Sequence, residues 1–306
     1  MQSQMSGRPE GAGGSAAAPS AESNEPGSTR GPPGPLHDPG PRPHVPSVLV
    51  LYRKHRRVIR GAYSVILALI AWELVGRYLL TSKLMFAPFS VVMREFAKLW
   101  ATGELEQDML VSFTELAIGL TISAVVGVVV GSLIAVSNAV GEHLDPLING
   151  LYATPLVAFS PILILVFGIG PPAIVAIVFL LAVFPILINT TAGIRSTDTS
   201  LIEAARSFSA SRFEIFRLVL LPSALPFIVA GLRLGMGRGL VGIFVGELSG
   251  ARKGLGYLIS VSSQVFNVPA MFVGVLVLAA AGVLFGAILE YVELKIAPWR
   301  QFDLKA

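Results

Sequence analysis

Long apolar runs separated by short polar segments make up most of the chain. A transmembrane helix needs roughly 20 mainly apolar residues in a row. Six windows reach that length, and they run over Gly61–Leu80, Leu110–Val136, Pro146–Phe167, Ala173–Ile194, Pro222–Leu248 and Ala270–Val292. The pattern therefore predicts an all-α, polytopic membrane protein of about six transmembrane helices, with a membrane domain over residues 61–295.

The polar segment 81–109, between the first two windows, has its own periodicity. Its apolar positions recur at helical spacing, at Phe89, Val92, Met93, Phe96, Leu99 and Trp100. This spacing predicts a short amphipathic helix at the outer membrane interface. The same face could instead pack against the neighbouring spans.

Glycine recurs every four residues in several of the windows. The fifth window holds two such rows, Gly231, Gly235, Gly239 and Gly242, Gly246, Gly250, and shorter rows occur at Gly127, Gly131 and Gly282, Gly286. Small residues allow helix backbones to approach closely in lipid, where no hydrophobic force draws helices together. We therefore expect tight packing around the fifth helix.

Composition agrees with the membrane class and excludes several kinds of chemistry. Of the 306 residues, 53% are hydrophobic and only 14% are charged, against about a quarter charged in soluble domains. Cysteine is absent, and none of the four histidines lies within a span, so we expect neither a metal site nor a Ser-His-Asp triad. No phosphate-binding loop of the G-x-x-x-x-G-K-[ST] type is present. We therefore predict a non-enzymatic chain without a cofactor of its own.

The first 46 residues are rich in Gly, Pro and Ser, a composition typical of a disordered tail. The juxtamembrane segment 47–60 then carries Arg53, Lys54, Arg56, Arg57 and Arg60. Positive residues flanking a span favour the cytoplasmic side, so six spans would leave both this end and the tail 296–306 in the cytoplasm. The basic cluster could also hold anionic lipid. No basic patch interleaved with aromatic residues indicates nucleic-acid binding.

Three ionisable residues of the fifth window are candidates for a translocation path: Arg233, Arg238 and Glu247. Charged groups inside a membrane are costly and commonly functional, although those near span ends can snorkel to the interface. Arg238 and Glu247 could line a water-filled path, or they could pair with charges on neighbouring helices. The sequence leaves both readings open.

A charged, amphipathic segment, residues 199–222, separates the fourth window from the fifth. Its apolar residues fall at near-helical spacing, at Leu201, Ala205, Phe208, Ile215 and Val219. The Ser-Ala-Ser run at 209–211 weakens the helix in the middle, and Pro222 suits the first turn of the next span. We expect two short helices joined by a turn at the inner face of the membrane.

This segment resembles the EAA loop of binding-protein-dependent ABC importer permeases. The family pattern is E-A-A, three residues, G, nine residues, I, one residue, L-P. Identical residues stand at Glu203, Ala204, Ala205, Leu221 and Pro222. Ser209 replaces the glycine and Val219 the isoleucine, and serine lacks glycine's freedom at positive φ.

Further stretches, such as "FPILINTTAGIRSTD" and "GLGYLI", look like the branch that imports nitrate, sulfonates and taurine. The resemblance implies the type I importer fold, a homodimer of permeases, two ATP-binding subunits that hold ATP and Mg, and an extracytoplasmic substrate-binding protein. It also implies alternating access. Contact with the ATPase would fall to Glu203, Ala204, Ala205, Ser209, Leu221 and Pro222.

Two other classes of protein compete with this reading. An ATP-independent secondary transporter or channel would be favoured by an inverted internal repeat, and no clear repeat is visible. A membrane-embedded enzyme would need a nucleophile and base in a cleft, and the sequence offers no such pair.

Overall fold

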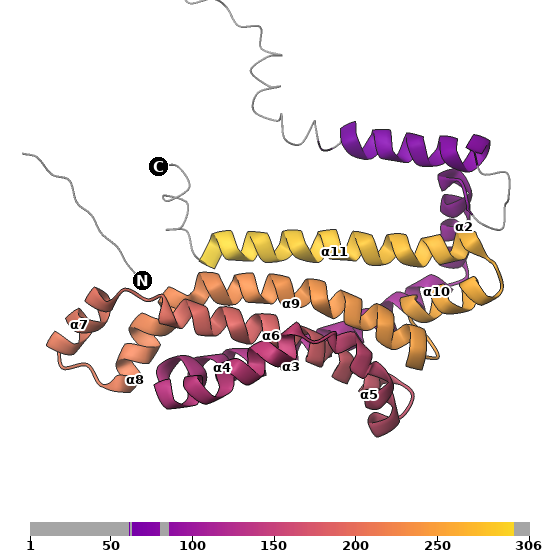
Figure 1. Cartoon of the computed structure of the whole chain (residues 1–306). Helices are drawn as coiled ribbons and strands as arrows, with labels where there is room; N and C mark the ends of the chain where they lie inside the picture. Colours follow the sequence, from indigo (N-terminus) through magenta and orange to yellow (C-terminus); the bar gives the residue numbers. More distant parts are fainter. Residues whose placement is uncertain (1–60, 62, 80–85, 297–306) are drawn as a thin grey trace, which may run out of the picture. The chain divides into compact units, whose positions relative to one another are not determined.

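The computed structural model describes residues 61, 63–79 and 86–296, and every regular element within these ranges is helical (Figure 1). Four of the described helices are long and apolar enough to cross a membrane: α3 (Glu104–Val136), α6 (Pro171–Arg195), the helix ending in α9 (Leu221–Gly250) and α11 (Val268–Ile296). The predictions for segments 1–46 and 47–60 and for the tail from residue 297 onward lie outside the described residues.

Helix α6 is the centre of the bundle. It packs against α9 and α3 more extensively than any other pair of described elements. In its most apolar stretch 61% of the residues are buried, against 33% in α3 and 17% in α11. Interhelical hydrogen bonds add to this packing, because the Thr191 hydroxyl of α6 donates to the Gly131 carbonyl of α3 over 3.0 Å. Most of the apolar surface of α6 is thus covered by other helices.

Most glycines of the α9 rows face α6, which agrees with the tight packing expected around the fifth helix. A Cβ built on Gly231 would lie 2.9 Å from the Cβ of Asn189 and 3.1 Å from the Cα of Ile186. Gly242 approaches the backbone of Val178 almost as closely, at 3.1 Å. Any larger side chain would push the two helices apart, so glycine sets their separation.

The predicted span over Pro146–Phe167 is present as a broken pair of helices. The structure has α4 (Asn138–Ala153), a short 3-10 turn at Leu156–Phe159 and α5 (Ser160–Phe167), with an 86° bend at the break. Thr154 adopts extended backbone, with ψ of 146°. Pro155 explains this, because the residue before a proline is driven out of helical conformation and the proline itself offers no N–H.

The first predicted span is helical over 63–74 and continues through a π-helical turn at Val75–Leu79. By length and composition the described chain holds four spans, or up to five if the bent pair counts as one. Six spans are compatible with this arrangement, because the first helix borders residues outside the described ranges.

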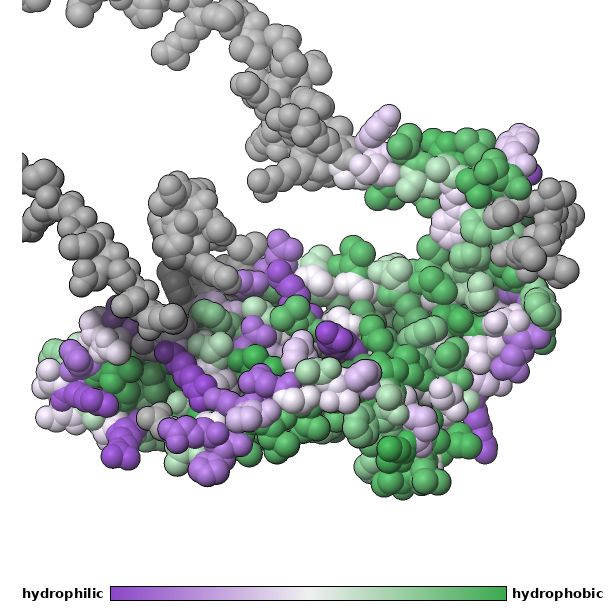
Figure 2. Space-filling view, in the orientation of Figure 1, coloured by the Kyte–Doolittle hydropathy of each residue, from purple (hydrophilic) through white to green (hydrophobic). Residues whose placement is uncertain are grey.

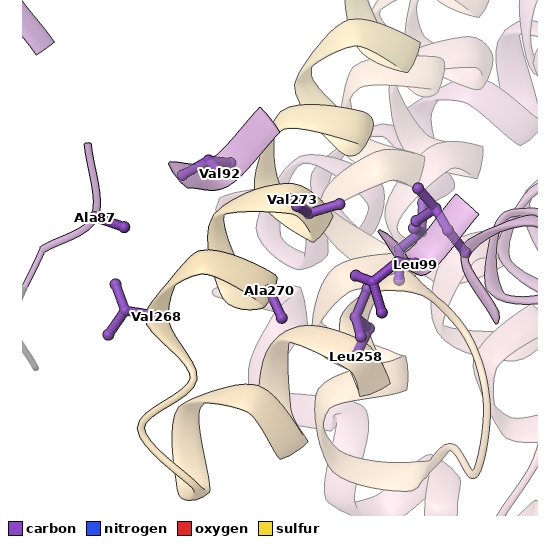
Figure 3. Close-up of a cluster of buried hydrophobic side chains, with 9 residues drawn as sticks. Ala87, Val92, Leu99, Leu258, Val268, Ala270 and Val273 are labelled. Atoms are coloured by element: carbon purple, nitrogen blue, oxygen red, sulfur yellow. The ribbon is translucent and has the colours of Figure 1, made fainter. Parts of the chain in front are cut away.

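The predicted amphipathic helix is present as α2 (Phe89–Ala101). The indole Nε1 of Trp72 donates to the Ala87 carbonyl over 3.0 Å, which ties the first helix to the start of α2. Val92 and Leu99 of α2 join a buried cluster with residues of α10 (Leu255–Gln264) and α11, seen in Figure 3. The apolar face of α2 therefore packs against spans, which was one of the two readings of its pattern.

Candidate functional site

The polar loop after α6 begins with a well-capped helix, α7 (Thr199–Ser207). The side chain of Asp198 accepts a hydrogen bond from the Ser200 backbone N–H over 2.8 Å. This bond holds the pKa of Asp198 below its ordinary value, because it stabilises the carboxylate. Asp is among the preferred N-cap residues, so this helix start is encoded locally.

Helix α7 ends in a Schellman turn centred on Ser209. The N–H of Ala210 donates to the Ala205 carbonyl over 3.1 Å, and the N–H of Ser209 to the Arg206 carbonyl over 2.8 Å. Ser209 has a φ of 59°, in the left-handed region where this motif most often places glycine. The serine therefore adopts the conformation that suits the glycine of the EAA pattern.

The second half of the loop starts at α8 (Arg212–Ile215), which has a capping box. The Ser211 hydroxyl accepts from the Glu214 N–H, and the Glu214 carboxylate accepts from the Ser211 N–H over 2.7 Å. This reciprocal pair satisfies two backbone donors at the helix start.

Helix α8 does not end before the fifth span. A π-helical turn at Phe216–Leu220 joins it to α9, so one helix runs over Arg212–Gly250. Pro222 lies in the first turn of α9, as predicted, but the expected separate short helix is continuous with the span. Pro222 lacks the N–H that a regular turn would use, and the wider turn immediately before it accommodates that loss. Movement of α8 would thus pass directly into α9.

The residues of the EAA pattern lie on both sides of this loop. Glu203, Ala204 and Ser209 are exposed, whereas Ala205, Leu221 and Pro222 are half-buried. Two phenylalanine side chains of the loop, which the EAA pattern does not include, are largely exposed to solvent. The exposed fraction is 88% for Phe208 and 69% for Phe213. Figure 2 shows hydrophilic side chains gathered over the end of the bundle that holds α7 and α8, and hydrophobic ones over α5.

The two arginines of α9 have partners on different helices. The Arg233 guanidinium donates to the Glu293 carboxylate of α11 over 2.9 Å. Arg238 is exposed, and its guanidinium lies 5.8 Å from the ring centroid of Tyr152 on α4. A cation held over an aromatic ring in this way is stabilised without losing its access to solvent or solute.

Glu247 is buried, with 1% of its surface exposed. Its carboxylate accepts from the Gly256 N–H over 2.6 Å. The two preceding N–H groups also go to buried side chains: Gly254 to Asp108 over 2.9 Å and Leu255 to Ser112 over 2.8 Å. The start of α10 is therefore held by α3 and α9 together, and Asp108 and Ser112 were not candidates from the sequence.

Glu115 of α3 lies near Glu247 and is itself 4% exposed. One carboxyl oxygen of each residue has no partner among the described residues. No group of three or more His, Asp or Glu side chains in the described ranges is arranged to hold a metal ion.

Comparison with known proteins now decides the class. The model of the family "Binding-protein-dependent transport system inner membrane component" matches residues 124–298. The chain belongs to this family. It is thus a multi-pass plasma-membrane permease subunit of an ABC importer and not itself an enzyme, because ATP hydrolysis falls to a partner ATPase. Membership implies work with such an ATPase and with a substrate-binding protein.

Individual relatives place the chain within one branch. It is 30% identical to SsuC of Bacillus subtilis (strain 168), a permease assigned to aliphatic sulfonate transport, over 81% of this chain and 90% of SsuC. It is 28% identical to the taurine transport system permease TauC of Escherichia coli (strain K12), over 80% of this chain and 90% of TauC. The branch is that of nitrate, sulfonate and taurine permeases, and nothing found favours a secondary transporter.

The fold agrees with a solved importer. An inward-facing structure of the MetNI methionine ABC transporter matches with a TM-score of 0.54 and 22% identity, over 64% of this chain and 97% of that chain. At this identity the likeness concerns the fold alone.

Proposed function

We propose that this chain is the permease of an ATP-driven importer for a small, organic anion such as a sulfonate or taurine, with nitrate as the inorganic candidate. The single observation that carries the coupling role is the loop α7–α8, whose second helix continues into α9. The cargo class is supported by similarity to permeases named for sulfonates, taurine and nitrate.

In this proposal the loop docks on the ATPase through its exposed residues. Glu203, Ala204 and Ser209 would contact the partner, and Phe208 would insert an apolar ring into its surface. Ala205, Leu221 and Pro222 would keep the loop in place on the bundle. ATP and Mg would be bound by the partner, and a change in its shape would reach α9 through the continuous helix at Phe216–Leu220.

Arg238 is the candidate path residue with the most open position, and Arg233 lies about one and a half turns away on the same helix. An exposed guanidinium over a tyrosine ring offers charge and stacking area to a passing anion. Glu247, the third candidate, is buried, and in the proposal it holds α10 against α3 and α9 rather than facing the cargo.

The proposed complex contains two copies of this permease, two ATP-binding subunits and an extracytoplasmic substrate-binding protein. Surrounding lipid would cover the outward face of α11, where Val283 is 76% and Leu284 58% exposed. Both chain termini and the α7–α8 loop would lie on the cytoplasmic side.

Co-purification with candidate ATPase subunits, followed by ATP hydrolysis in liposomes, tests this function. We expect one substrate-binding protein, loaded with taurine, an alkanesulfonate or nitrate, to stimulate hydrolysis. Arg238→Gln should weaken stimulation by the loaded binding protein and leave complex formation intact. Failure of every ATPase to form a complex would refute the proposal.

A further inference from the structure

A cavity of about 860 Å³ lies on the inner side of the α7–α8 loop. Its walls come from the last turns of α3 and α6, from both loop helices and from the π-helical turn before α9. It is separate from the exposed residues assigned above to ATPase contact. The charged residues that line it are all positive: Arg195, Arg206 and Arg212 contribute to the lining, and no acidic residue does.

The positive charge of this cavity is only partly compensated. Arg195 donates to the Asp145 carboxylate over 2.8 Å. Arg206 and Arg212 form no ion pair within the described part of the chain. Glu214, two residues after Arg212, accepts the Ser211 N–H instead, and Glu203, three residues before Arg206 on α7, forms no ion pair with it; both arginines are exposed. Two guanidinium groups therefore lack an anionic partner.

Thr197 adds a buried polar group beside the cavity. It lines the cavity, only 9% of its surface is exposed, and its hydroxyl Oγ1 is buried without a hydrogen-bond partner among the described residues. Buried hydroxyl groups are rarely left unpaired, because the desolvated group then loses its bonds to water without replacement. Rotation of the Thr197 side chain would bring its hydroxyl to the cavity surface, where a ligand oxygen would accept the hydrogen bond.

Apart from Thr199, the remaining lining residues are apolar. Ile194, Phe216 and Leu220 line the cavity, and Val136, at the end of α3, is 52% exposed beside it. A fully hydrated inorganic ion gains nothing from such walls, whereas a charged headgroup on an apolar chain gains from both parts. Basic pockets between helix ends at the cytoplasmic surface suit anionic lipid headgroups.

We propose that this cavity binds a phosphate group, which Arg206 and Arg212 neutralise and to which the Thr197 hydroxyl donates, and that an inner-leaflet anionic phospholipid supplies it. Bound there, the ligand would bridge the end of α6 and the loop. Coupling between ATPase and permease would then depend on the lipid composition of the membrane.

The test uses the full chain in complex with its ATPase, in nanodiscs of phosphatidylcholine with or without phosphatidylglycerol. Native mass spectrometry measures phosphatidylglycerol retained per complex. We expect the double variant R206Q/R212Q to lose about 30-fold in apparent affinity for phosphatidylglycerol, because each arginine contact with the headgroup contributes about 1 kcal/mol. T197V, which keeps the shape and removes the hydroxyl, should lose several-fold. R217Q removes one positive charge from the same loop outside the cavity and should bind as the wild type does.

A second arm separates the two sources of phosphate. Inorganic phosphate is added to complexes in pure phosphatidylcholine, and the thermal midpoint is measured. Stabilisation of the wild type and R217Q but not of R206Q/R212Q, without selective lipid retention, would assign the site to free phosphate. Equal lipid retention in R206Q/R212Q and R217Q, with no selective effect of inorganic phosphate, would overturn the inference. Neither arm requires a cargo, so this result is independent of the proposed transport function.

Discussion

Replacing Ser209 tests whether the turn between α7 and α8 depends on left-handed backbone. Ser209 has a φ of 59°, a conformation that costs a non-glycine residue about 1–2 kcal/mol. Ser209→Gly removes this cost, but glycine also makes the unfolded chain more flexible, which raises the entropic cost of folding by about 0.5–1 kcal/mol. The net effect on the turn should therefore be small. Ser209→Val, which adds a branched Cβ, should raise the free energy of the turn by about 1–2 kcal/mol.

The amide of Ala210 reports this change directly, because it donates to the Ala205 carbonyl only when the turn is closed. An increase of about 1–2 kcal/mol corresponds to roughly a 5- to 30-fold larger open population. Hydrogen exchange at Ala210 should accelerate by that factor in Ser209→Val and by less than about twofold in Ser209→Gly. Stimulation of the ATPase by binding protein should fall in parallel.

Ser207→Val is the matched control, because it makes the same chemical change within the regular helix α7, where serine and valine have similar propensities. Exchange at Ala210 should stay close to the wild-type rate in this variant. Equal exchange rates in Ser209→Val, Ser209→Gly and Ser207→Val would refute the argument that positive φ governs this turn.

Three further substitutions test other parts of the account. Glu203→Arg should preserve membrane insertion but abolish ATP-driven uptake, since it reverses charge on the exposed docking side, and wild-type uptake would contradict that role. Glu247→Ala should leave the Gly256 N–H without its acceptor, which should lower the free energy of unfolding by about 1–3 kcal/mol. The thermal midpoint in detergent should then fall by roughly 2–4 °C for each kcal/mol lost. Glu247→Gln keeps an acceptor for that N–H, so an equal fall of the midpoint in this variant would argue against the hydrogen bond. Gly231→Leu should lower the free energy of unfolding by about 1–3 kcal/mol or more, because its Cβ would lie 2.9 Å from a side chain of α6. Gly237→Leu points into open space and should be tolerated. Similar losses of stability in thermal melts of both variants would contradict the packing of α9 on α6.

The parts of the fold that the sequence predicts are those determined by residues close together along the chain. The helices follow from apolar runs long enough to span lipid, and the close contact of α9 with α6 follows from glycine every fourth residue. The turn at Ser209–Ser211 follows from weak helix formers. The bend at Pro155 was foreseeable in kind, because prolines mark breaks, but its size of 86° depends on what the two halves pack against.

The anchoring of α10 could not be predicted from local pattern. Asp108 and Gly254 are 146 residues apart in sequence, and only the packing of α3 beside α9 brings them together. Nothing in the Gly-Leu-Gly stretch at 254–256 indicates which side chains accept hydrogen bonds from its backbone. Likewise, the pairing of Arg233 with Glu293 depends on α11 returning along α9, a contact between distant segments.

The most direct test of the central claim is uptake into proteoliposomes that contain this permease, its ATPase and an external binding protein. Radiolabelled taurine, an alkanesulfonate and nitrate are supplied outside, with ATP and Mg inside. The account predicts accumulation of one of these anions that requires both ATP and the binding protein, and that is lost in Glu203→Arg. Accumulation driven by an ion gradient in vesicles without the ATPase would contradict it.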